Sequence, residues 1–149
     1  MTQRVPPPVL ADTPDEVEAL LYAALRQGDL EGLMRLWADE EDIVCVHPGG
    51  GRVIGAAAIR ASFESIFANG GIPIQPEQVH RVRHAAFALH HLAERIEVRG
   101  PQGLQTGWVL TSNVYVKTPA GWRLVAHHAS PGAPSDMPTQ GGDAPNMLH

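Results

Sequence analysis

The chain of 149 residues contains a single cysteine and only two tyrosines, and no long run of apolar residues. One thiol cannot form a disulfide within the chain, so Cys45 in the apolar run 43–46 is expected to be a buried thiol. No segment approaches the roughly 20 apolar residues that a membrane-spanning helix requires, and the N-terminus lacks the apolar core of a secretory signal. The sequence therefore predicts a cytoplasmic protein without a membrane partner.

Basic residues are also scarce. Eleven Lys and Arg residues stand against sixteen Asp and Glu residues, which gives a formal net charge of -5. The basic residues are scattered singly, whereas a nucleic-acid surface requires a concentrated basic face. The glycines at 49–51 are not followed by the Lys-Ser/Thr pair of a phosphate-binding loop. We expect no nucleic-acid partner and no organic cofactor.

Histidine, in contrast, is abundant. The chain has eight, and four of them form the doublets His90-His91 and His127-His128 inside apolar runs. Successive side chains on a strand point to opposite faces, so each doublet should send one imidazole inward and one outward. Imidazole changes its charge near neutral pH. These doublets predict a polar, titratable interior.

The first half of the chain has the signals of three helices. Residues 13–16, Thr-Pro-Asp-Glu, form a capping box with proline at the first helical position, and Gly28 ends the apolar stripe that follows. Asp29 is placed to cap a second helix. A third helix is expected to begin near Gly55 and to end at the glycine pair 70–71.

The second half has the alternating, β-branched pattern of strands, expected at 74–84, 86–99, 104–117 and 122–130, with a short strand at 43–47. Helices followed by a meander predict an α+β fold. Residues 1–11 and 132–149 are expected to be flexible, which leaves one domain at 12–131. Neither face of the strand at 104–117 is fully polar, so we expect a homodimer formed sheet to sheet.

Three stretches carry a family resemblance: residues 25–30 with 37–39, residues 47–49 with 55–60, and residues 122–131. In this order they resemble the SnoaL-like members of the nuclear transport factor two-like superfamily. The resemblance implies a cystatin-like cone, in which three N-terminal helices pack on a strongly curved, mostly antiparallel sheet. It also implies a pocket between the helices and the sheet.

Ketosteroid isomerase, another member of that superfamily, supplies an expectation about chemistry. Its carboxylate base moves a proton while a tyrosine and a protonated aspartic acid hold the oxyanion. By resemblance, His47 stands at the position of the base and Asn113 at that of the protonated acid. The tyrosine position falls on Leu21, with Tyr22 one residue away, so that donor is expected to be absent.

The same resemblance implies a pocket wall and two further possibilities. If His47, His91 and His128 converge, they form an alternative three-histidine metal site. The last stretch also resembles the association domain of calcium/calmodulin-dependent kinase II, which assembles into rings. The residues expected to bind the ligand are Leu21, Trp37, Phe63, Phe87, Leu89, His91, Ala126, His128 and Ser130.

These observations lead to one main hypothesis and one competitor. The main hypothesis is a domain that binds a small, mostly apolar molecule bearing oxygen, with His47 as a base for isomerase- or cyclase-type proton transfer and Asn113 as the enolate donor. The competitor is a ligand-binding or oligomerisation module without catalysis.

Overall fold

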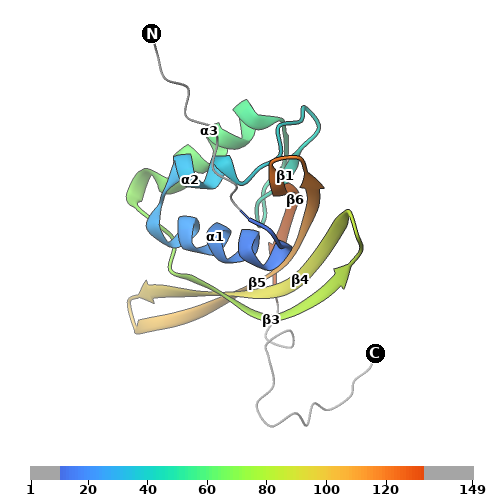
Figure 1. Ribbon diagram of the computed structural model, residues 1–149. Helices are drawn as coiled ribbons and strands as arrows, with labels where there is room; N and C mark the ends of the chain where they lie inside the picture. Colours follow the sequence, from blue (N-terminus) through green and yellow to red (C-terminus); the bar gives the residue numbers. More distant parts are fainter. Residues whose placement is uncertain (1–10, 133–149) are drawn as a thin grey trace, which may run out of the picture.

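A computed structural model describes residues 11–132 (Figure 1). The segments expected to be flexible, 1–11 and 132–149, lie outside the described residues except for Ala11 and Gly132. Ala11 is buried and its carbonyl accepts a hydrogen bond from Trp122, while the Gly132 amide donates to Trp108. No helix between residues 11 and 132 has both the length and the apolar character needed to cross a membrane.

Three helices precede a long antiparallel meander, as the α+β prediction requires (Figure 1). The sheet order is β2-β1-β6-β5-β4-β3, and every pairing is antiparallel except that of β1 with β6. The short strand β2 was not expected. The elements are α1 Pro14–Gln27, α2 Leu30–Arg35, β1 Val44–Val46, β2 Arg52–Ile54, α3 Ala56–Ile66, the 3₁₀ turn η1 Phe67–Asn69, β3 Ile74–Arg83, β4 Phe87–Gly100, β5 Gly103–Thr118 and β6 Gly121–Pro131.

The helix ends follow the local signals in the sequence. The Thr13 hydroxyl accepts a hydrogen bond from the Glu16 amide, and the Glu16 carboxylate accepts one from the Asp12 amide. Gly28 ends α1 with φ of 67°, a conformation that glycine adopts at little cost. The Asp29 carboxylate caps α2 by accepting from Gly32. These caps confirm the predicted start and end of the first helix and the predicted start of the second.

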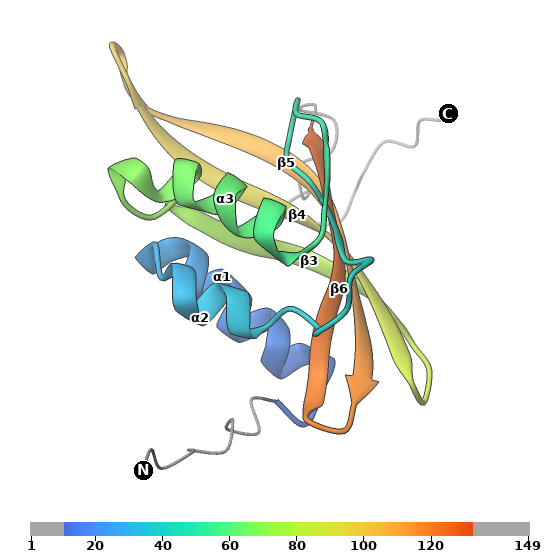
Figure 2. The ribbon, with the colours of Figure 1, turned by 90° about the horizontal axis from the view of Figure 1, so that it is seen from above.

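All three helices lie on one side of the curved sheet, which divides it into an inner and an outer face (Figure 2). The inner face carries the core, which includes Leu92, Tyr115 and Leu124 from the sheet and Val17 and Ile59 from the helices. On the outer face, apolar side chains from β3 to β6 remain partly exposed. The expected arrangement, three helices packed on one face of a curved and mostly antiparallel sheet, is therefore confirmed.

The chain leaving η1 passes very close to the end of α1. A Cβ atom added at Gly71 would lie 2.0 Å from the Arg26 carbonyl oxygen, and backbone atoms there cannot move aside. The adjacent Ile72 amide donates to the Leu25 carbonyl at 2.8 Å, which fixes this approach. Glycine at position 71 is required by packing, not by a turn.

We predict that Gly71→Ala lowers the free energy of unfolding by about 1–3 kcal/mol, the usual cost of overpacking. Gly51→Ala is the control, because a Cβ atom there meets nothing within 4 Å, and it should change stability by less than about 0.5 kcal/mol. Chemical denaturation measures both. Equal stabilities would contradict the close approach.

Candidate functional site

The inner face of the sheet carries a buried polar layer under the helices. His90 of β4 lies opposite Asn113 of β5, which lies opposite His127 of β6, so the three side chains form one row across the sheet. All three are buried, as is Glu94, which shares their face on β4. Strand alternation places these side chains together, because His90, Leu92 and Glu94 are two residues apart.

A directed chain of hydrogen bonds crosses this layer. His127 Nδ1 lies 2.6 Å from Asn113 Oδ1, which can only accept, so Nδ1 carries the proton. Asn113 Nδ2 donates to the Tyr22 hydroxyl at 3.2 Å, and that hydroxyl donates to Glu94 Oε2 at 2.5 Å. Tyr22 comes from α1, so the helix closes the chain. Every bond points toward the Glu94 carboxyl group.

Burial shifts the pKa values of these groups in opposite directions. Desolvation raises the pKa of Glu94 to about 7, although hydrogen bonds to the carboxylate oppose the rise. Desolvation lowers the pKa of His127 to about 3, helped by the nearby imidazoles of His47 and His128. It also raises the pKa of Tyr22 well above 10, with the Glu94 charge as the next cause. Glu94 is therefore a carboxyl group poised to exchange a proton near neutral pH.

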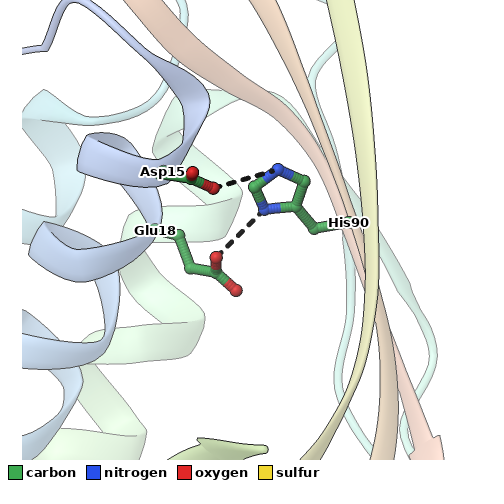
Figure 3. A group of neighbouring side chains, drawn as sticks. All are labelled: Asp15, Glu18 and His90. Carbon is green, nitrogen blue, oxygen red and sulfur yellow. Dashed lines mark hydrogen bonds and ion pairs between the residues drawn. The ribbon is translucent and has the colours of Figure 1, made fainter. Parts of the chain in front are cut away.

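The second part of the polar layer holds His90 between two carboxylates of α1 (Figure 3). Its Nδ1 lies 3.0 Å from Glu18 Oε1, and its Nε2 lies 3.6 Å from Asp15 Oδ1. Asp15 and Glu18 are three residues apart and so share one helix face. The buried Glu18 carboxylate orients the imidazole, an arrangement common for catalytic and metal-binding histidines.

The same three side chains form a possible metal-binding group, with candidate ligand atoms within 4.8 Å of one another. However, the two carboxylates approach different nitrogens of the ring, and Arg81 Nε donates to the same Asp15 oxygen at 2.8 Å. To bind one metal ion, both carboxylates would have to move to the same nitrogen of the His90 ring. The ion would also have to displace the Arg81 guanidinium from Asp15. The arrangement is better described as a network of polar contacts among His90, Asp15, Glu18 and Arg81 than as a metal centre.

His47 lies on the inner side of the sheet beyond β1, half-buried and edge-on to the Phe63 ring of α3. Its Nε2 is 2.9 Å from the Ser62 hydroxyl, whose own proton is donated to the Ile59 carbonyl. Nε2 must therefore donate, which leaves the lone pair on Nδ1. Burial lowers the pKa of His47, so the ring is a neutral base at neutral pH.

A cavity of about 430 Å³ opens between α1 and β3, next to the polar layer. Asp15, Glu18 and Tyr22 line it from the helix, and Val79 and Arg81 line it from the strand. Here β3 has an irregular register between Glu77 and His80, and Gln78 adopts φ of 49°. Such irregularities re-aim side chains beside binding sites.

The predicted site residues divide between the two faces. Asn113, Leu21, Trp37 and Phe63 are buried, and His47 contacts α3. The expectation that one member of each histidine doublet faces inward is confirmed, but the choice of member was wrong: His90 and His127 are inside. The other expected wall residues lie on the outer face or its edge: Phe87, Leu89, His91, Ala126, His128 and Ser130.

The residues expected to face inward on β4 and β6 are each one position away from those that do. On a strand, a shift of one residue moves a side chain to the opposite face of the sheet. His91 and His128 are exposed on the side opposite to His47, so the three-histidine metal site is not formed. The Tyr22 donor, which was expected to be absent, contacts Glu94 and Asn113. Sequence reasoning also missed Glu94, although a glutamate between apolar residues 92–93 and 96 was an available signal.

We predict that the free energy of unfolding of Glu94→Gln, minus that of the wild type, increases by about 1.4 kcal/mol per pH unit between pH 4.5 and 7. Over this range the native protein keeps a proton on Glu94 that the unfolded chain has lost, so the wild type loses stability as the pH rises. The variant lacks this contribution, while the opposing one of His127 is common to both proteins.

Denaturation in urea at several pH values measures this difference. Glu64→Gln, at an exposed position on α3, is the control and should keep a constant difference from the wild type. A pH-independent difference for Glu94→Gln would show that the native carboxyl group titrates normally.

Comparison with known proteins identifies the architecture. Residues 15–134 match the family model described as the SnoaL-like domain. A domain from Thiobacillus denitrificans, provisionally described as a calcium/calmodulin-dependent protein kinase type II association domain, is 32% identical with a TM-score of 0.76, over 83% of this chain and 98% of that one.

A second structure, from Streptomyces avermitilis and provisionally described as a dehydratase of the nuclear transport factor two-like family, is 32% identical with a TM-score of 0.69, over 80% of this chain and 99% of that one. A protein with a cystatin-like fold from Novosphingobium aromaticivorans shares 20% identity and a TM-score of 0.66, over 80% and 81% of the two chains. The comparison with curated proteins gives no match. The chain therefore belongs to the SnoaL-like domain family of the nuclear transport factor two-like superfamily.

Proposed function

We propose that the protein binds a small, mostly apolar molecule bearing oxygen at the buried polar layer and transfers a proton next to that oxygen. The observation that carries this proposal is the Tyr22–Glu94 pair, in which a buried carboxyl group with a pKa of about 7 accepts a tyrosine hydroxyl. Purely structural carboxyl groups are usually exposed or paired with a cation. The cavity between α1 and β3 reaches the tyrosine of this pair, because Tyr22 lines it.

The chemistry follows from the hydrogen-bond directions. Tyr22 occupies Oε2 of Glu94, so a proton bound to that carboxyl group sits on Oε1. From there it can be donated to a carbonyl oxygen of the substrate, and the resulting charge is shared with Tyr22 and Asn113 behind it. In this scheme Asn113 does not hold the enolate oxygen directly, as the sequence-based hypothesis has it, but supports the Glu94 carboxylate through the tyrosine.

Two histidines are candidates for the base that removes the carbon-bound proton. His47 has its Nδ1 lone pair available, as the original hypothesis requires, but its partner is the Ser62 hydroxyl. His90 has the carboxylate partner that general bases commonly have, and Glu18 beside it lines the cavity. The experiment below distinguishes these two bases.

We predict that the protein accelerates exchange of the α-protons of 2-tetralone, a compact and mostly apolar ketone, in D₂O near neutral pH. Proton NMR measures the loss of the α-proton signal. Tyr22→Phe keeps the ring but removes the donor and should slow the exchange by about 10²-fold or more. Removing the base should slow it by a similar factor: His47→Ala if His47 is the base, or His90→Gln if His90 is.

His84→Ala is the control for these variants, because His84 is exposed at the β3–β4 turn and stacks only on Phe87. This variant should catalyse exchange of the ketone's α-protons at the wild-type rate. If the α-protons exchange no faster with the wild-type protein than in buffer alone, the enzymatic proposal is contradicted. Saturable binding of the ketone without exchange would instead support the noncatalytic ligand-binding alternative.

A homodimer formed through the outer face of the sheet is the second proposal, and a specific row of side chains favours it. Val82, Leu89, Val114 and Ala126 lie opposite one another across four strands. Phe87 beside them is 44% exposed. Contiguous apolar patches of this kind mark protein–protein interfaces. Relatives described as association and hub domains support an oligomer of this fold.

We predict a dimer in sedimentation equilibrium at micromolar concentration. Leu89→Asp places a charge at the centre of the row and should yield monomers, because a buried unpaired carboxylate opposes association. Val98→Asp is the matched control: Val98 is 49% exposed near the far end of β4 and should leave the dimer intact. A monomeric wild type would overturn the prediction.

A further inference from the structure

A second hollow, of about 920 Å³, lies at the end of the sheet where the β5–β6 hairpin meets the end of α2 and the start of α3. It shares no lining residue with the cavity between α1 and β3. We call it the hairpin groove. It has no part in the proton-transfer proposal, so its side chains require a separate explanation.

Arg123 of β6 is the most unusual residue of the hairpin groove. The side chain is largely buried, with 8% of the residue exposed, and burial lowers its pKa. Its Nη1 donates to the Trp122 carbonyl at 3.1 Å. Among residues 11–132 no carboxylate pairs with it. A guanidinium has five N–H donors, and the nitrogens of Arg123 that do not make this bond still reach the solvent of the groove.

The start of α3 contributes a second, independent feature. The helix is 11 residues long, and Gly55 at its N-cap provides no side-chain hydrogen bond. Its first turn, Ala56–Ala58, contains no acidic residue. Of these three residues only Ala56 lines the hairpin groove, whereas Ala57 and Ala58 line a neighbouring hollow with Asp39, Glu40 and Glu41. The amides at a helix start lack intrahelical acceptors and carry a partial positive charge, which makes this end a site for anions.

The remaining charges favour an anion as well. Arg35 and Lys117 line the groove with Arg123, whereas Asp39 and Glu40 are the two acids that line it, so one positive charge is left in a chain whose net charge is negative. Neither Arg35 nor Lys117 forms an ion pair within the described part of the chain.

From the buried Arg123 and the uncapped start of α3, we propose that the hairpin groove binds a small oxyanion, such as a phosphate group or the carboxylate of a metabolite. Arg123 can offer paired N–H donors to two oxygens, and the Ala56 amide at the start of α3 can bind a third. Lys117 on the hairpin adds a mobile charge at the rim.

The proposal is tested by titrating the full chain with inorganic phosphate and, separately, with acetate, in chloride-balanced buffer of constant ionic strength. Isothermal calorimetry measures the affinities. We expect saturable binding that Arg123→Gln weakens at least about tenfold, because a charge-assisted contact is lost. Arg52→Gln removes the same charge from exposed β2 and should leave the affinity unchanged. The tighter of the two anions identifies the ligand class.

A second variant keeps the proposal testable if Arg123→Gln fails to fold. Ala56→Glu places a carboxylate at the first turn of α3, where it favours the helix but fills the anion position. It should abolish phosphate or acetate binding, whereas Ala61→Glu, at an exposed site in mid-helix, should not. The proposal is overturned if neither anion binds above the chloride background, or if each variant binds as tightly as its control.

Discussion

The requirement that buried polar groups find partners governs how α1 lies on the sheet. His90 and Glu94 of β4 are buried on the inner face, where water cannot satisfy them. Their partners come from one side of α1: Glu18 contacts His90 and Tyr22 contacts Glu94. Sliding or rotating the helix would break both contacts at once. The polar layer therefore fixes the relative position of helix and sheet more specifically than apolar packing does.

The same layer explains why its titratable groups behave unusually. Burial penalises any charge, so the carboxyl group of Glu94 retains its proton to higher pH and the imidazole of His127 loses its proton at lower pH. Both groups approach neutrality, which lets Asn113 and Tyr22 link them by hydrogen bonds. A carboxyl group held near its midpoint at neutral pH is costly for stability but suited to proton transfer. The presence of such a destabilising group in the core supports a functional role for the polar layer.

Strand alternation separates two of the three surfaces that we assign to different roles, and the third lies at the end of the sheet. The inner face holds the polar layer, the outer face presents the apolar row centred on Leu89, and the hairpin groove lies where the β5–β6 hairpin meets the end of α2 and the start of α3. Because neighbouring residues such as His90 and His91 face opposite sides, ligand chemistry and self-association can change independently. The similar structures include one provisionally described as a dehydratase and one provisionally described as an association domain.

Much of the fold was determined by local signals in the sequence. The capping box at 13–16, the left-handed Gly28 and the Asp29 cap set the helix ends, and the alternation after residue 71 sets the meander. These features depend on a few neighbouring residues, so sequence alone defines them. The short strand β2 was missed because three residues carry too little periodicity, and it exists through pairing with β1.

Only the tertiary structure decided which faces of the strands meet the helices. A doublet such as His127-His128 shows that one imidazole points inward, but the choice depends on a partner, Asn113, that comes from another strand. The site pair Tyr22–Glu94 is likewise separated by 72 residues. Sequence therefore determined the elements and their order, whereas long-range polar contacts determined the register between them and the residues of the site.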